Sequence, residues 1–551
     1  MKTKYLDLME KALEAYTGDH IQRYFDAVQA EGMTEHGFPR LTANMGILIS
    51  KGRKTELLPL FCRMMDFVCE SFLKVKAAND FSVKEIIFCI MELDGKEIVK
   101  QERIAYWKSL LKEIEPYECY NVCVRTPDEL AYNWACFTAV SEFMRQHIGL
   151  ADTTEIVDIQ LGSQMRWLDE SGMYMEPNNP MVYDMVPRGL FAILLHFGYQ
   201  GKYRKVLEDC LEKASLLTLK MQSVSGEIPY GGRSNQFLHN EAHLAILLEH
   251  GASLFAAKGD YETAGAFKAA TQKALGNIEK WLSQQTIHHV KNYYPIQSLM
   301  GCEDYAYFDK YMITAASFMY VAYLLCDETI PVGTWDRRKP YTLKLTPPFH
   351  KIFLNAGGYF AEYDWEADPH YDASGLGRVH KEGVPEAICI SVPCPEHPEY
   401  HIDAQTPAAM SICPGFMGTD GPVFALGNGE THIPGLLDSD DKKAVAEIKT
   451  QWEDRVLDAE YAVSEQGVEI TVIGSGDVVC MLTAFTFDGE QSTQIEHAGN
   501  ILRIGYKGHW CTYTTDGEIA DLGRDGGNRN GRYHAYFAKG SGCLKVRIVL
   551  E

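Results

Sequence analysis

At 551 residues the chain is too long for one ordinary hydrophobic core, so its length predicts at least two domains. A hydrophobic fraction of 46% and a charged fraction of 23% are typical of a folded globular protein and argue against disorder. The formal net charge of −23 argues against a nucleic-acid groove, because phosphate binding depends on clustered Lys and Arg.

The first residues, Met1 to Leu8, lead into an amphipathic helix and lack the apolar core and cleavage site of a signal peptide. This favours a cytoplasmic protein. The longest apolar run, 312–326, is shorter than a membrane span, so it predicts a buried helix and no membrane partner. The 15 cysteines are scattered without paired spacing, as expected for reduced thiols in the cytosol.

Residues 5–325 carry apolar side chains at helical spacing, in segments of about ten to twenty residues. Short breaks with Gly or Pro, such as 36–39 and 176–180, separate these segments. The pattern predicts roughly a dozen helices without a strict sequence repeat. Antiparallel helix pairs that close into a ring would bury the apolar faces of all of them. We therefore predict a helical ring over residues 1–335.

The character of the sequence changes across the proline-containing region 331–348. Beyond it, Gly, Asp and Asn turns divide short alternating or β-branched segments, which predict strands. The predicted strands include 351–363, 468–473, 478–485, 501–506, 510–515 and 544–550. We expect an antiparallel β-sandwich over residues 345–551, packed against one rim of the helical ring.

The densest polar cluster lies at 229–243, where a glycine turn leads into an apolar helix. Gly231 and Gly232 can adopt backbone conformations closed to other residues, and Ser234 or Asn235 would cap the helix. His239 and His243 share one helix face, whereas Glu241 leaves from another side. Polar groups are costly to bury without partners, so the cluster predicts a functional site. Alternatively, the cluster is only the capped start of a helix, and its histidines form hydrogen bonds with backbone carbonyls. The candidates are Tyr230, Arg233, Asn235, His239, Asn240 and Glu241.

Four further segments place polar side chains at helix entrances or in the β-domain. Their candidates are Asn133, Trp134, Tyr183, Asp184, Arg188, Glu303, Asp304, Arg378 and His380. A structural alternative stands beside each segment: helix capping or packing for Asn133, a helix N-terminal anion for Asp184, and solvated charges for the other two. Aromatic rings stack on sugar faces while charged and amide groups hold hydroxyls and carboxylates. Together the segments predict a carbohydrate cleft.

Three of these motifs occur in the same order as in helical-toroid proteins of carbohydrate-degrading bacteria. They are Tyr132-Asn133-Trp134, Tyr183-Asp184 before a Gly-Leu-Phe helix, and Tyr230-Gly231-Gly232-Arg233-Ser234. The chain resembles domain of unknown function family 2264 and, more loosely, glycoside hydrolase family 154 and the heparinase II/III-like polysaccharide lyases. The resemblance implies an N-terminal (α/α)6-type toroid followed by an antiparallel β-sandwich, and activity on glycans that bear uronic acids.

Two reactions fit the candidates. A glycosidase needs a proton donor and a second carboxylate. Glu241 and Asp184 are the first pair, Glu303 and Asp304 are substitutes, and Arg233 would hold a substrate carboxylate. A lyase must neutralise the uronate, remove the C5 proton and protonate the leaving oxygen. The resemblance gives that work to Asn, His and Tyr, here Asn133 or Asn240, His239, Tyr230 or Tyr183, and His380. Trp134 departs from the heparinase-like pattern, in which an Asn-His pair is more typical.

A cytosolic protein would meet short imported oligosaccharides or small glycuronides rather than long polymers. We therefore predict an exo-acting β-glucuronidase-like hydrolase. A uronate lyase is the nearest rival, and a non-catalytic glycan-binding protein is the third alternative. The sequence contains no phosphate loop, nucleotide fingerprint or convincing metal-ligand set, so we expect neither cofactor nor metal. A homodimer is compatible with a large acidic enzyme of this kind.

Overall fold

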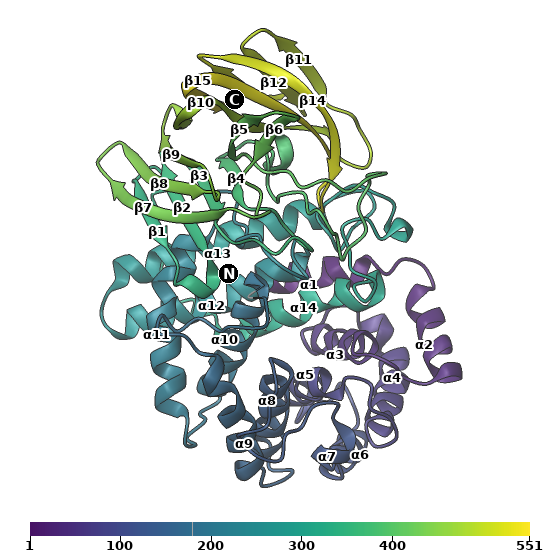
Figure 1. Cartoon of the computed structure of the whole chain (residues 1–551). Helices are drawn as coiled ribbons and strands as arrows, with labels where there is room; N and C mark the ends of the chain where they lie inside the picture. The colour runs from purple at the N-terminus through teal and green to yellow at the C-terminus, as the bar shows by residue number, and fades with distance from the viewer. Residues whose placement is uncertain (179) are drawn as a thin grey trace.

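The computed structural model describes residues 1–178 and 180–551, in which a helical half is followed by a β half. In Figure 1 the helices, purple to teal, fill the lower part of the molecule, and the strands, green to yellow, lie above them. The last long helix ends at Leu325 and the first strand begins at Tyr341. The predicted division at 335 and 345 stays a prediction.

Six helices form a closed inner ring, in which each packs against the next and the last returns to the first. They are α3 (Gly37–Ser50), α5 (Asn79–Leu93), α8 (Trp134–His147), α10 (Met181–His196), α12 (Leu238–Ala257) and α14 (Phe308–Leu325). Every residue of α3 is buried, because neighbouring elements cover all sides of the helix. Gly46 permits this close packing, since a Cβ there would lie 2.3 Å from Sγ of Cys89 in α5.

Further helices cover the ring from outside: α4 packs on α3, α9 on α8, α13 on α12 and α1 on α14. They are α1 (Lys2–Glu14), α2 (His20–Glu31), α4 (Leu58–Ser71), α6 (Gln101–Lys112), α7 (Pro116–Cys119), α9 (Thr154–Gln164), α11 (Arg204–Met221) and α13 (Tyr261–Leu282). In α11, Leu207, Leu211 and Ala214 are buried at helical spacing, as in an amphipathic helix. The two layers of helices confirm the predicted toroid.

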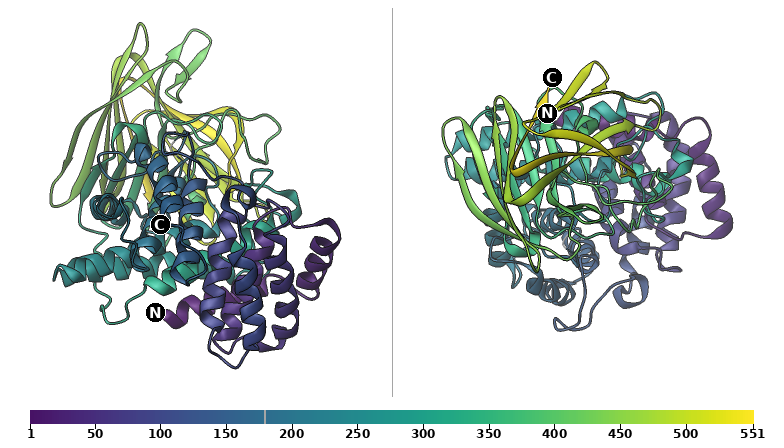
Figure 2. Two further views of the ribbon diagram at one scale, coloured as in Figure 1. Left: turned by 90° about the horizontal axis from the view of Figure 1, so that it is seen from below. Right: turned by 45° about the horizontal axis from the view of Figure 1, so that its top comes forward.

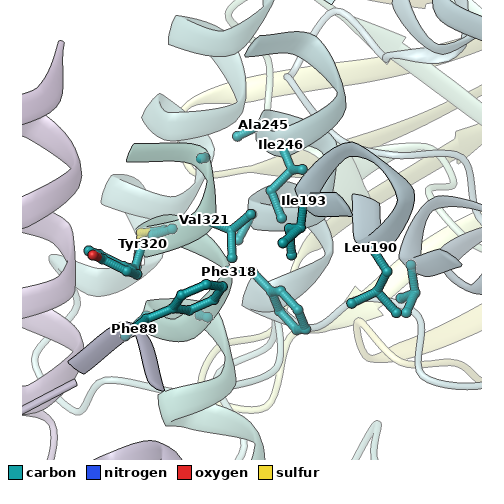
Figure 3. Packing of buried hydrophobic residues seen from close by; sticks show 14 of the residues in the cluster. Phe88, Leu190, Ile193, Ala245, Ile246, Phe318, Tyr320 and Val321 are labelled. Atoms are coloured by element: carbon teal, nitrogen blue, oxygen red, sulfur yellow. The ribbon is translucent and has the colours of Figure 1, made fainter. Parts of the chain in front are cut away.

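Apolar side chains fill the interior of the ring. Phe88 of α5, Ile193 of α10, Ile246 of α12 and Phe318 of α14 meet there, together with Leu190 (Figure 3). The centre of the ring is therefore a packed hydrophobic core, and any cavity at its end is blind.

The β half contains a four-stranded and an eleven-stranded sheet whose strands pair antiparallel. The smaller sheet has the order β1 (Tyr341–Lys344), β2 (Lys351–Ala356), β3 (Tyr359–Asp364), β4 (Gly375–Lys381). The larger follows the path β11-β12-β13-β15-β10-β9-β8-β7, while β14 pairs with β15 and the β5-β6 hairpin pairs with β10. Its strands are β5 (Pro414–Gly418), β6 (Gly421–Phe424), β7 (Thr431–Ser439), β8 (Lys443–Gln451), β9 (Val456–Ser464), β10 (Gly467–Phe487), β11 (Gln494–Ala498), β12 (Ile501–Tyr506), β13 (His509–Thr515), β14 (Glu518–Gly527) and β15 (Arg532–Leu550). The predicted strands 468–473 and 478–485 are one strand, β10, with an irregularity between Ile473 and Asp477.

The smaller sheet lies between the toroid and the larger sheet. Along β2, Ile352 and Leu354 join the core between the two sheets, whereas Phe353 joins the core of the toroid. Successive strand residues point to opposite faces, so one strand serves both cores. On the face of the smaller sheet that is turned away from the toroid, β1 and β2 pack against β7 and β8 of the larger sheet (Figure 2). This arrangement confirms the predicted fold class, a toroid followed by an antiparallel β-sandwich.

Candidate active site at the mouth of the helical ring

The N-terminal portions of all six inner helices surround one small cavity of about 50 Å³. Its lining residues are His36, Arg40, Phe81, Phe137, Val182, Tyr183, Val186, His239, His243, Tyr311, Thr314 and Phe318. We call this lining, with the neighbouring Arg233, Ser234 and Tyr305, the toroid mouth. The unpaired N–H groups of helix N-termini carry partial positive charge, so the mouth favours negatively charged ligands.

Arg40 of α3 lies at the floor of the mouth, 2% exposed, between the rings of Phe81 and Phe318. Its Nε donates to Glu85 Oε1 at 3.0 Å, and its Nη1 lies 3.0 Å from His36 Nδ1. Its Nη2 has no hydrogen-bond partner among residues 1–178 and 180–551. A buried guanidinium with a free N–H group can bind an acceptor from a ligand.

His239 and His243 enter the mouth from consecutive turns of α12, as their spacing predicted. They are 5% and 2% exposed, and in the described part of the chain Nδ1 of each ring has no partner. Burial, and then the charge of Arg40, lower the pKa of His239 to about 3, so its imidazole is neutral at pH 7. The ring of His243 lies 3.7 Å from that of Phe318, deeper in the mouth. Among the described residues, neither histidine forms the backbone carbonyl bond of the alternative interpretation.

Three tyrosine hydroxyls meet at Ser234 on the rim of the mouth. The Ser234 Oγ atom lies 3.1 Å from Tyr183 Oη, 3.0 Å from Tyr305 Oη and 3.5 Å from Tyr311 Oη. Ser234 has a φ of +57°, in the left-handed region, which the turn before α12 imposes. Burial raises the pKa of all three tyrosines, so each keeps its proton at neutral pH.

Arg233 lies beside this hydroxyl cluster, with its guanidinium 4.5 Å from the ring of Tyr183. Its Nη2 donates to Glu176 Oε1 at 2.7 Å, and Asn133 Nδ2 donates to the same oxygen at 2.6 Å. Burial raises the pKa of Glu176, although Arg233 opposes the shift. Trp134 follows at the start of α8 and makes an edge contact with Phe81. The structure therefore brings together four of the candidates, Arg233, Asn133, Trp134 and Tyr183.

The β half closes one side of the mouth. Arg529, between β14 and β15, donates to both oxygens of Glu303, at 2.7 and 3.2 Å, and the Ser234 N–H donates to the same carboxylate at 2.6 Å. Asp304 is exposed and pairs with His401 at 2.8 Å. A wider hollow of about 490 Å³ adjoins the mouth here, because Tyr305 lines it as well. Its other lining residues are Glu303, Asp304, Tyr371, Pro398, Glu399, Tyr400 and His401.

Glu241 does not reach the mouth, contrary to our expectation. It is fully buried, and its Oε1 accepts from Lys291 Nζ at 2.7 Å. Lys291 also lies 3.2 Å from Glu227, and Arg378 of β4 lies 3.5 Å from the other oxygen of Glu227 and 3.2 Å from Glu362. We call these five residues the interdomain charge cluster. Burial raises the pKa of Glu241, and the nearby charge of Glu227 adds to the shift while Lys291 opposes it.

Asp184 and Arg188 bind each other on the side of α10 away from the mouth. Both are at most 1% exposed, and Arg188 Nε donates to Asp184 Oδ1 at 2.9 Å. The Tyr174 N–H donates to the same carboxylate at 2.8 Å, and Arg188 also reaches Thr218 of α11. These contacts join α10 to neighbouring elements. The structure thus places Arg233, Glu241 and Asp184 around three different sites, and the predicted common hollow is wrong.

The remaining candidates hold the turn at 229–240 and the domain interface. The Asn240 Oδ1 caps α12 by accepting from the Phe237 N–H at 2.9 Å, a role that we expected of Ser234 or Asn235. The Asn235 Nδ2 donates to the Pro229 carbonyl at 3.1 Å. The side chain of Tyr230 is buried under Lys351, whose Nζ lies 3.5 Å from the ring centroid. His380 lies between Ser223 and Ser391, with contacts of 2.6 and 2.9 Å.

The sequence interpretation missed Arg40, His36 and Phe81. The segment 36–39 stood only as a break between helices. An arginine one turn into the mostly apolar segment 37–50 was the available signal, because such a charge is buried only with partners. No group of three or more His, Cys, Asp or Glu able to hold a metal ion occurs among the described residues. None of the described helices combines the length and the apolar character that a bilayer crossing needs.

No family model and no curated protein matches the chain. Solved structures similar to it include heparinase III, with 7% identity, a TM-score of 0.38, and coverage of 85% of this chain and 76% of that one. A chondroitinase AC lyase has 9% identity, a TM-score of 0.48 and coverage of 98% and 83%. A glycosyl hydrolase family 88 protein from Bacteroides vulgatus has 11% identity, a TM-score of 0.35 and coverage of 59% and 98%. The resemblance to family 2264 and to glycoside hydrolase family 154 stays a prediction.

Proposed function

We propose that the protein is a carbohydrate-active enzyme that cleaves uronate-containing glycans by β-elimination at the toroid mouth. One observation carries the proposal: three protonated tyrosines and Ser234 form a hydroxyl cluster beside the neutral imidazole of His239, whose Nδ1 has no partner within the described residues. Elimination needs a proton acceptor for C5 and a proton donor for the leaving oxygen, and this arrangement supplies both without a metal. Arg40 and the helix N-termini favour an acidic sugar.

The reaction can be written on these residues. His239 takes the proton from C5 of the uronate, and the electron pair forms the C4=C5 double bond as the C4–O bond breaks. Tyr305 or Tyr183 gives its proton to the departing oxygen. Ser234 links the two tyrosine hydroxyls. After the product leaves, water takes the proton from His239 and water returns a proton to the tyrosinate, which restores both groups. A base and an acid of this kind typically contribute about 10²–10⁴-fold each to the rate.

Hydrolysis, in the form of the predicted exo-acting β-glucuronidase, is the second candidate. The raised pKa of Glu176 favours it, because a protonated carboxylic acid at the rim would suit the acid step. Glu303 would then be the second carboxylate. Both groups hold arginine partners, Arg233 and Arg529, which fix them as charged structural groups more readily than as catalysts. Elimination therefore ranks first.

Two assays on the purified protein test the proposal. Uronate oligosaccharides are followed for the ultraviolet absorbance of unsaturated ends, and an aryl β-glucuronide is followed for free aglycone. We expect unsaturated product, lost by at least about 100-fold in His239→Gln and in a Tyr183→Phe, Tyr305→Phe double variant. Tyr106→Phe, at an exposed tyrosine of the outer helix α6, is the matched control and should keep full activity.

The outcomes separate the candidates. Release of aglycone without unsaturated ends would replace elimination by hydrolysis, and Glu176→Gln should then abolish turnover. No product from either substrate would favour the glycan-binding alternative.

A further inference from the structure

At the floor of the toroid mouth two buried cations share one carboxylate in the part of the chain that the structure describes. Arg40 and Lys84 share a single carboxylate, Glu85, whose Oε1 lies 3.0 Å from Arg40 Nε and 2.9 Å from Lys84 Nζ. All three side chains are buried. Burial lowers the pKa of Lys84 to about 8 against the effect of Glu85, so the ammonium is still mostly charged at pH 7. Within the described residues neither cation forms a second ion pair, which leaves a net charge of +1.

The same cavity is lined by residues whose polar atoms lack partners. Arg40 Nη2, His239 Nδ1 and His243 Nδ1 make no hydrogen bond in the part of the chain that the structure describes, although their side chains are more than nine-tenths buried. A buried polar group without a partner destabilises the fold. Three such groups and an unbalanced charge around one cavity indicate a binding site for an anionic group.

The size of the cavity limits what can enter. Its volume of about 50 Å³ corresponds to roughly three or four water-sized groups, enough for a carboxylate and too small for a sugar ring. Part of its wall is apolar and includes Phe81, Phe137 and Val186. Beyond Phe318 the ring is packed with the side chains of Figure 3, so nothing can pass further inward.

We propose that this niche binds the carboxylate of a terminal uronate, with Arg40 and His243 holding the carboxylate and His239, one helical turn nearer the rim, facing C5. The anion site rests on the contacts above, and its assignment to a uronate rests on the proposed function. The sugar ring then lies at the rim against the tyrosines, and the rest of the chain extends into the 490 Å³ hollow. We expected Arg233 to hold the carboxylate, but it is paired with Glu176 and lies at the rim of the mouth instead.

Calorimetric binding tests the niche without turnover. D-Glucuronate, D-glucose and inorganic sulfate are titrated into the wild-type protein and into Arg40→Met. We expect glucuronate to bind the wild type, glucose to bind at least ten-fold more weakly, and Arg40→Met to lose about 10–100-fold in glucuronate affinity, as expected for a charge-assisted hydrogen bond. Arg63→Met, at an exposed arginine of the outer helix α4, is the matched control.

Thermal unfolding adds a second readout. Arg40→Met removes the unbalanced charge and leaves Lys84 on Glu85, so we expect an unchanged or higher melting temperature. A purely structural ion pair would instead give a loss of several degrees.

The results are decisive in each direction. Equal affinities for glucuronate and glucose, equal affinities for sulfate and glucuronate, or an unaltered glucuronate affinity in Arg40→Met would each overturn the niche. Elimination activity with an unchanged KM in Arg40→Met would overturn the niche alone. Arg40-dependent glucuronate binding by a protein without elimination activity would overturn the proposed function alone.

Discussion

Replacing Lys291 with Met tests whether the interdomain charge cluster stabilises the fold. Lys291 Nζ lies 2.7 Å from Glu241 and 3.2 Å from Glu227, and the three side chains are at most 3% exposed. Methionine keeps the length of the side chain but leaves two buried carboxylates without their shared cation. Breaking a buried ion pair in this way costs about 3–5 kcal/mol. Because unfolding entropy is about 2 cal/mol/K per residue, the melting temperature of a chain of 551 residues should fall by about 3–4 °C at pH 8.

The loss should depend on pH. The pKa of Glu241 is raised to about 7 in the folded protein, above its unfolded value, so the folded state holds a proton that the unfolded state has released. Its contribution to stability is therefore fully present at low pH and is lost as pH rises through about 7. Removing Lys291 raises this pKa further, so the variant should lose less at pH 5 than at pH 8.

Differential scanning calorimetry of wild type and Lys291→Met at both pH values is the measurement. A Lys291→Met, Glu241→Gln double variant should recover part of the loss. Lys258→Met removes a 42% exposed lysine paired with Glu212 and should change stability by less than about 1 kcal/mol. A loss in Lys291→Met as small as that control, or equal losses at pH 5 and pH 8, would refute this account of the cluster.

Two further predictions concern packing and the corrected site. Gly377→Ala should destabilise the protein at the domain interface by about 1–3 kcal/mol, since a Cβ there would lie 2.3 Å from Tyr230 Oη. Gly276→Ala is the control: this glycine of α13 is exposed with open space around it, so the change should be neutral or slightly stabilising. Equal denaturation midpoints for the two variants would contradict this prediction. Asp184→Asn should lower the melting temperature strongly, because Arg188 stays buried without its anion. The kcat of the folded fraction should change less than about three-fold. A loss of about 1,000-fold in kcat at unchanged stability would show that Asp184 is a catalytic residue after all.

The sequence predicted the fold well because hydrophobic spacing is a local signal. Helical spacing to Leu325 and alternation beyond Tyr341 follow from which faces are buried, and the structure has helices and strands there. The site was predicted only in part. His239 and His243 reach the mouth together because an i, i+4 pair shares a helix face. By the same rule Glu241 lies on a different face of the helix, in the interdomain charge cluster. The sequence shows that two faces differ without showing which cavity each one meets.

Arg40 illustrates the limit more sharply. The groups that define its environment come from residues distant in sequence, such as Thr314 on α14 and His239 on α12. A single sequence does not show which distant helix will be the neighbour that closes the ring. The importance of Arg40 appears only in its three-dimensional contacts, in which Nη2 has no hydrogen-bond partner among the described residues.

The smaller sheet contributes alternate residues to two cores, and this makes the halves of the molecule interdependent. Excising the β half would expose the surface that Phe353 and Phe360 now cover on the toroid, while excising the toroid would leave Lys351, Glu362 and Arg378 on a bare sheet face. Neither fragment would have a complete hydrophobic core of its own. A lineage that exchanged one half for an unrelated module would have to rebuild that shared layer residue by residue, so we expect the two halves to be inherited as a single unit.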